Sequence, residues 1–182
     1  MKKNIAILSA VFGALAYLYM IISVIRNGSE GLSLSTFALG AALAWITGFT
    51  MLKQKANPTV PMIYGIGATI TAVLLFIDGR CSWTGFDTVI ALLVACCIIL
   101  WLSKGPRYAL ILSVAAALIS FVPYLTMTWK NPAASPIIPN TGFLLANILA
   151  FASAKTWTLE DRLYAASNTI LCAALVIPWL LF

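Results

Sequence analysis

The chain has 182 residues, of which 62% are hydrophobic and only 9% are charged, and its mean hydropathy is +1.01. This balance lies far from that of ordinary globular proteins and excludes a soluble domain. The net charge of +6 does not indicate a nucleic-acid partner, because the basic residues fall in short loops between apolar stretches.

Seven apolar stretches are each long enough to cross a membrane, since a hydrocarbon core about 30 Å thick needs roughly 20 helical residues. In chain order they are 4–25, 34–52, 59–77, 85–103, 107–129, 137–154 and 161–182. The first stretch is too long for a cleavable signal peptide. The sequence therefore predicts an all-α, multi-pass integral membrane protein with seven transmembrane helices.

An internal repeat relates the first stretch to the fifth. A shift of 104 positions places 7–9 on 111–113, both Ile-Leu-Ser, and 26–27 (Arg-Asn) on 130–131 (Lys-Asn) without a gap. Three stretches follow the same order in each copy, whereas 85–103 has no counterpart. We therefore expect two parallel three-helix bundles joined by a linker helix, in a 3+1+3 arrangement. The predicted units are a first repeat at 1–80, the linker at 81–104 and a second repeat at 105–182, a plan typical of transporters.

The loop charges predict the orientation. With seven spans, eight basic residues lie on one side: Lys2, Lys3, Lys53, Lys55, Lys104, Arg107, Lys155 and Arg162. Three lie on the other: Arg26, Arg80 and Lys130. By the positive-inside rule, we expect the N-terminus in the cytoplasm and Phe182 outside, in the cell (inner) membrane.

Several kinds of chemistry lack their usual residues. The chain contains no histidine, its four cysteines form no C-x-x-C pair, and Cys81 lies alone in a loop. We therefore expect no metal, no cofactor and no enzymatic activity. No ionisable residue lies near the centre of a stretch, which favours movement of a neutral solute over proton or ion coupling.

Polar residues inside the stretches are the candidate binding residues. Asn147 lies among leucine and isoleucine residues, and Phe151 follows one turn later on the same face. In the first copy that face carries Thr47. Asn168 lies in the last stretch, and the position 104 residues before it is Tyr64. Each could line a binding site, or could instead form a hydrogen bond between helices.

Three motifs resemble those of the PQ-loop and SWEET transporters. Residues 26–34 (Arg-Asn-Gly-Ser-Glu-Gly-Leu-Ser-Leu) are similar to the loop after the first helix of these proteins. Residues 123–132 are similar to their Pro-Gln-Leu run with Trp-Lys. Residues 166–168 (Ala-Ser-Asn), with Asp161 seven residues before Asn168, resemble their seventh-helix motif. The resemblance implies that Asn168 and Tyr64 line a central cavity and that Pro123 is a hinge in the fifth helix.

The sequence thus predicts a SWEET/PQ-loop-like facilitative carrier of a small neutral solute, a sugar or another polar metabolite, which works by alternating access. Two alternatives remain open on the same fold: a membrane receptor, and a structural or lipid-interacting protein without transport. The expected partners are the lipid bilayer and the solute. The sequence leaves open whether the chain forms a homo-oligomer.

Overall fold

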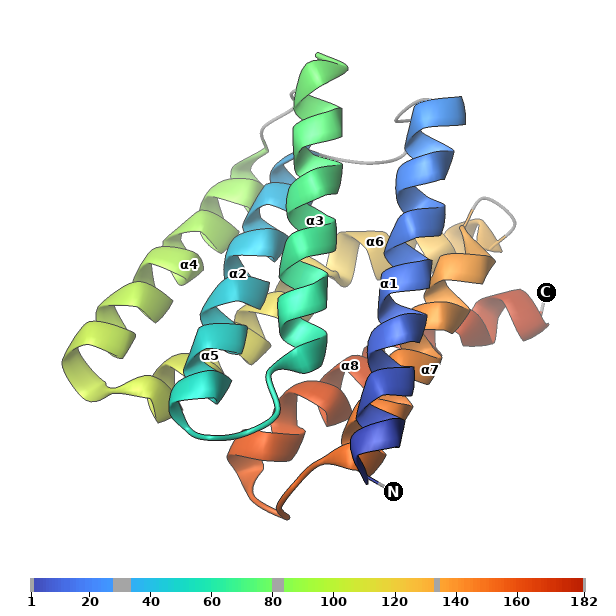
Figure 1. Cartoon of the computed structure of the whole chain (residues 1–182). Helices are drawn as coiled ribbons and strands as arrows, with labels where there is room; N and C mark the ends of the chain where they lie inside the picture. Colours follow the sequence, from blue (N-terminus) through green and yellow to red (C-terminus); the bar gives the residue numbers. More distant parts are fainter. Residues whose placement is uncertain (1, 28–33, 80–83, 133–134, 182) are drawn as a thin grey trace.

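A computed structural model describes residues 2–27, 34–79, 84–132 and 135–181 (Figure 1). Within these ranges every regular element is a helix. In chain order they are α1 (Lys2–Asn27), α2 (Leu34–Lys53), α3 (Thr59–Ile77), α4 (Gly85–Lys104), α5 (Pro106–Ser120), α6 (Val122–Lys130), α7 (Ile137–Ser153) and α8 (Leu159–Leu181). Most of the 26–34 loop motif, together with Arg80, Cys81 and Phe182, lies outside the described residues.

The helices have the length and composition of membrane spans. Six spans in the described chain are long and apolar enough to cross a bilayer, with α5 and α6 together forming one span, Pro106–Lys130. The apolar helix α7 is shorter, at 17 residues, and rises about 25 Å at 1.5 Å per residue. The chain is therefore an all-helical, multi-pass integral membrane protein, as its composition predicts.

The fifth predicted stretch is broken near its far end. α5 ends at Ser120, Phe121 separates the two helices, and α6 starts at Val122 with Pro123 in its first turn. Proline has no backbone N–H to donate to the preceding turn, and its ring crowds that turn. The helix break expected from Pro123 is present.

Two sets of contacts hold the helices together. α1 packs against α7 and α3, whereas α2 packs against α3 and α5 (Figure 1). α4 covers α5 and α2, and α8 packs mainly against α7. One buried apolar cluster joins α2, α3, α5 and α8, and a second joins α2, α4 and α5.

Small residues let α1 approach its neighbours closely. A methyl group built on Gly67 of α3 would lie 2.2 Å from Cγ of Tyr17 on α1. A methyl group on Gly142 of α7 would lie 2.9 Å from Cβ of Ala16. Close backbone approach at small residues is a usual way for membrane helices to associate, because lipid provides no hydrophobic force between them.

One end of the bundle gathers most of the charge. Lys2 Nζ at the start of α1 donates to Ala154 O after α7, at 3.0 Å. At the same end, Arg107 Nε lies 3.1 Å from Glu160 Oε1, which links the starts of α5 and α8. Lys53 Nζ, at the end of α2, lies 5.0 Å from the ring centroid of Trp101 near the end of α4. We call this the basic end; it carries the eight basic residues that the loop count assigns to one side, with Glu160 and Asp161 as its acidic residues.

Candidate functional site

A hydrogen-bonded polar pair lies inside the bundle between α3 and α7. Nδ2 of Asn147 donates to Oη of Tyr64 and to the carbonyl oxygen of Phe143, each at 2.8 Å. The same Nδ2 lies 3.8 Å from Sγ of Cys172 on α8. Asn147 is 0% exposed. The amide faces protein because the hydrocarbon core offers it no hydrogen-bond partner.

The carbonyl oxygen of this amide is an unused acceptor. Asn147 Oδ1 is buried, and no described residue donates a hydrogen bond to it. Leaving a buried acceptor unsatisfied costs about 1–3 kcal/mol. Asn147 therefore keeps one free acceptor at the centre of the packed helices, where a bound donor could satisfy it.

Tyr64 and three other aromatic residues around the polar pair form a group of four rings. They come from α1, α3, α7 and α8 and are Tyr17, Tyr64, Phe143 and Tyr164, which we call the aromatic cluster. Ring centroids lie 4.8 Å apart for Tyr17 and Phe143, 5.2 Å for Tyr64 and Phe143, and 6.3 Å for Tyr64 and Tyr164. All three pairs meet edge to face, the arrangement that aromatic quadrupoles favour. The cluster gives the polar pair uncharged, largely apolar walls.

Asn168 lies on α8 near this cluster. Its Nδ2 donates to the carbonyl oxygen of Tyr164, one turn earlier on the same helix, at 2.9 Å. Tyr164 in turn contacts Tyr64 edge to face. The structure thus joins Asn147 and Tyr64 directly and links Asn168 to them through Tyr164.

The other two predicted binding residues have different surroundings. Phe151 lies near the end of α7, where the guanidinium carbon of Arg162 is 4.7 Å from its ring centroid and Arg162 Nη1 donates to its carbonyl oxygen. Thr47 lies on α2, and its hydroxyl forms a 2.9 Å hydrogen bond with Ser113 on α5. The polar contacts of Phe151 and Thr47 are thus made apart from the Asn147–Tyr64 pair.

A carboxylate at the basic end was not among the predicted site residues. Asp161, only 4% exposed, accepts hydrogen bonds from the backbone N–H groups of Asn57 at 2.9 Å and Thr156 at 2.8 Å. It also accepts one from the Thr156 hydroxyl at 3.3 Å. We call Asn57, Thr156 and Asp161 the Asp161 clamp; it ties the α2–α3 loop to the start of α8. Asn57 and Asp161 are 104 residues apart, so the repeat offset is the signal that could have paired them.

A second polar cluster lies at the opposite end of α7. Nδ2 of Asn140 lies 3.0 Å from the hydroxyl of Ser135 and 3.2 Å from that of Tyr124 on α6. Thr128 also lies within hydrogen-bond distance of Ser135, at 3.4 Å. These contacts hold α6, just after the break at Phe121, against the start of α7.

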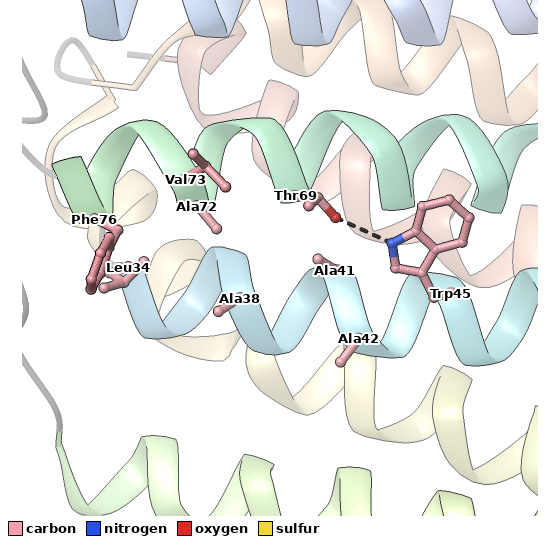
Figure 2. A pocket seen from close by; sticks show the side chains of 9 residues that line it. All are labelled: Leu34, Ala38, Ala41, Ala42, Trp45, Thr69, Ala72, Val73 and Phe76. Carbon is pink, nitrogen blue, oxygen red and sulfur yellow. Dashed lines mark hydrogen bonds between the residues drawn. The ribbon is translucent and has the colours of Figure 1, made fainter.

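Two hollows on the described structure are grooves between helices. One holds about 430 Å³ between α2 and α3, where the indole N–H of Trp45 donates to the Thr69 hydroxyl at 3.2 Å (Figure 2). The other holds about 450 Å³ between α1 and α3, near the basic end. Neither groove is lined by the Asn147–Tyr64 pair.

No known protein family, curated protein or solved structure matches this chain significantly.

Proposed function

We propose that the protein is a facilitative carrier of a small neutral solute, such as a sugar or another polar metabolite, with α1–α3 and α5–α8 as its two moving halves. In this proposal α4 is the linker of a 3+1+3 arrangement. The solute binds at the Asn147–Tyr64 pair and reaches it when the two halves separate.

The pairing of helices supports two related halves. The offset of 104 residues relates α1 to α5 and α6, α2 to α7, and α3 to α8. The contact of α1 with α7 then corresponds to that of α5 with α2, and the contact of α2 with α3 to that of α7 with α8. A two-fold relation requires such reciprocal contacts, and it brings equivalent residues near the axis together. Asn57 and Asp161 are such a pair.

The free acceptor of Asn147 is the observation that carries the proposal. It lies where α3 of one half meets α7 of the other, so movement of the halves would change its surroundings. A hydroxyl or amide N–H of a solute would satisfy Oδ1, and the aromatic cluster would contact the solute's apolar faces. The site has no charged side chain among its polar contacts, and burying an unpaired ionic solute there would be unfavourable.

Two features fit the movement that a carrier needs. The Asp161 clamp holds the halves together at the basic end, so its hydrogen bonds must break for that end to open. At the other end, Pro123 has no N–H to bond the preceding turn, so the break before it lets α6 change direction relative to α5 more easily than an unbroken helix would. We assign the clamp as the gate of the basic end and Pro123 as the hinge.

The direct test is uptake by the purified protein in liposomes. We expect the wild type to equilibrate at least one member of a panel of radiolabelled monosaccharides and polyols. Asn147→Leu should abolish that uptake with little change in the yield of folded protein, because an interhelical hydrogen bond contributes only about 0.6 kcal/mol on average. Asn168→Ala should also reduce uptake. Ser103→Ala is the matched control, since its hydroxyl bonds only its own helix on an exposed face of α4.

A second result decides between carrier and non-carrier. If the wild type moves no member of the panel, the carrier proposal fails and a receptor or structural role on the same fold takes its place. If Asn147→Leu transports normally, the solute site lies elsewhere.

The gate can be tested with a natural reporter. Cys172 is buried and lies beside Asn147, so its thiol should react slowly with a membrane-impermeant maleimide. In a chain with Cys81, Cys96 and Cys97 replaced by serine, Asp161→Ala should increase the labelling rate of Cys172 from the basic end. An unchanged rate would show that the clamp does not control access.

A further inference from the structure

The groove between α1 and α3 has a form that fits a lipid chain. Ala6, Ala10 and Ala14 line it from α1 at intervals of four residues, and therefore lie on one face of the helix. Thr59 and Ile63 line it from α3. Because alanine side chains are small, they leave a hollow of about 450 Å³ open toward the outside of the bundle.

The length of the groove matches one leaflet of a bilayer. It extends along α1 from Lys3 to Ala14, a rise of roughly 16 Å at 1.5 Å per residue. Half of a hydrocarbon core about 30 Å thick is about 15 Å. Lys3 lies at the basic end of the bundle, so the groove begins where lipid headgroups lie and ends near the middle of the membrane.

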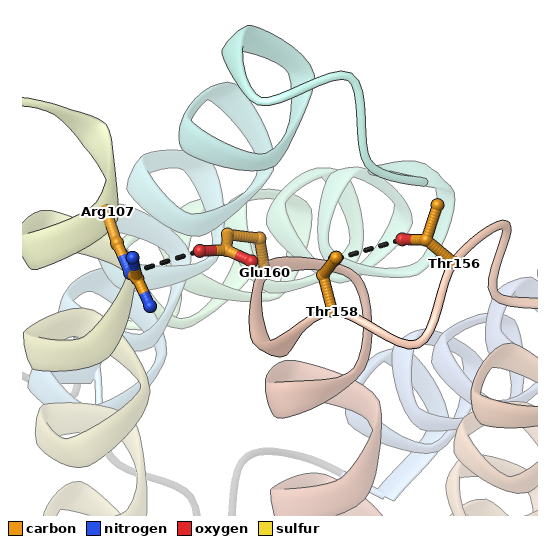
Figure 3. Close-up of polar contacts among 4 residues, drawn as sticks. All are labelled: Arg107, Thr156, Thr158 and Glu160. Atoms are coloured by element: carbon orange, nitrogen blue, oxygen red, sulfur yellow. Dashed lines mark hydrogen bonds and ion pairs between the residues drawn. The ribbon is translucent and has the colours of Figure 1, made fainter.

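Lys3 lacks the partner that the equivalent residue of the second copy has. The position 104 residues after Lys3 is Arg107, whose Nε lies 3.1 Å from Oε1 of Glu160 (Figure 3). The position 104 residues before Glu160 is Ala56, which has no carboxylate. Lys3 forms no ion pair with any residue of the described chain. A cation at the headgroup level of an apolar groove is complementary to an anionic lipid.

We propose that this groove binds an anionic phospholipid, with one acyl chain along Ala6, Ala10 and Ala14 and the phosphate on Lys3. The proposal is independent of the carrier function. In this proposal the lipid phosphate pairs with Lys3 in the way that the Glu160 carboxylate pairs with Arg107.

A second copy of this chain is a poorer occupant of the groove. A carboxylate that paired with Lys3 would have to come from the basic end of the second copy, where the acidic residues are Glu160 and Asp161. Glu160 pairs with Arg107, and Asp161 accepts the hydrogen bonds of the clamp. A protein contact would thus cover the Lys3 charge without a free carboxylate to pair with it.

The test is native mass spectrometry of the full-length protein in neutral detergent, titrated with phosphatidylglycerol or with phosphatidylcholine of the same chain length. The wild type should bind phosphatidylglycerol more tightly. Lys3→Gln should weaken phosphatidylglycerol binding roughly fivefold, the effect expected of one lysine near a membrane surface, and leave phosphatidylcholine unchanged. Ala10→Leu should weaken both lipids by filling the groove. Ala14→Phe, at an exposed position, provides the same test if Ala10→Leu does not fold.

Arg107→Gln is the matched control, because it removes one positive charge from the same end without touching the groove. It should keep the preference for phosphatidylglycerol. Equal loss in Arg107→Gln and Lys3→Gln would overturn the proposal in favour of diffuse attraction. Competition by soluble glycerol phosphate at equal strength would overturn it in favour of a free phosphate site. Loss of a dimer, rather than of bound lipid, in Ala10→Leu would show that a second copy occupies the groove.

Discussion

Two interfaces that the repeat makes equivalent differ in what they bury. The α1–α7 interface and the α5–α2 interface each contain a buried serine at the same repeat position. Ser9 donates to the carbonyl oxygen of Ala146 at 2.6 Å, and Ser113 forms a 2.9 Å hydrogen bond with Thr47. Beside these contacts the similarity ends. Asn147, which directly follows Ala146 on α7, corresponds in the repeat to Leu43, one turn before Thr47 on α2, and both are almost fully buried.

The difference suggests a division of roles. α4 covers the α5–α2 interface, and Leu43 belongs to an apolar cluster with Ile90 of α4 and Ala116 of α5. The α1–α7 interface has no such cover from α4 and carries the amide and the aromatic cluster instead. Similar backbone packing thus supports an apolar contact at Leu43 on one side and a polar site at Asn147 on the other, which is why we assign the solute to Asn147.

Replacing each of these two residues by the other type should change stability by very different amounts. Leu43→Asn places an amide in the apolar cluster and removes packed methyl groups, which should lower the free energy of unfolding by about 3 kcal/mol or more. Asn147→Leu loses the hydrogen bonds of Nδ2 but also removes the unsatisfied Oδ1, so its stability should change by less than about 1 kcal/mol. Unfolding in detergent, followed by tryptophan fluorescence, measures both. Equal losses would contradict the division of roles.

A glycine substitution tests the close approach of α1 to α3. In Gly67→Ala the new methyl group would lie 2.2 Å from the base of the Tyr17 ring, so the ring must move away from the aromatic cluster. Overpacking of this kind lowers the free energy of unfolding by about 1–3 kcal/mol. Gly40→Ala on α2 is the control, since nothing lies within 4 Å of its new methyl group. The control should match the wild type or be up to about 1 kcal/mol more stable; similar destabilisation in both variants would show that Tyr17 is not held against Gly67.

The two serines should behave alike. Ser9→Ala and Ser113→Ala each remove one buried hydrogen bond between helices, and each should lower the free energy of unfolding by about 0.5–1.5 kcal/mol. Ser103→Ala, on an exposed face, should leave it unchanged. Values for Ser9 and Ser113 that differ by more than about 1 kcal/mol would mean that the interfaces differ in their framework as well as in Asn147 and Leu43.

The sequence predicts the helices well and their rotations poorly. The stretch 59–77 coincides with α3, and the break at Pro123 follows from the missing N–H. Asn147 points inward as expected, because lipid cannot satisfy an amide. Phe151 and Thr47 are placed less successfully, since the helices are apolar on nearly every face and no polar stripe fixes which face meets which neighbour. The Asp161 clamp depends on loops brought together by the whole fold, so hydropathy alone could not reveal it.

The smallest predicted effect concerns the pair that Lys3 lacks. Arg107 is 66% exposed at its side chain, and exposed ion pairs contribute about 0–1 kcal/mol. Arg107→Gln should therefore lower the free energy of unfolding by less than about 1 kcal/mol, and the loss should disappear near 1 M salt, where the screening length is about 3 Å. Lys3→Gln should not change stability in neutral detergent, because Lys3 forms no ion pair with the residues that the structure describes. It should, however, reduce the rise in melting temperature that phosphatidylglycerol gives the wild type. If Lys3→Gln destabilises the protein in detergent as much as Arg107→Gln does, Lys3 has a protein partner, and the two repeat positions are alike rather than different.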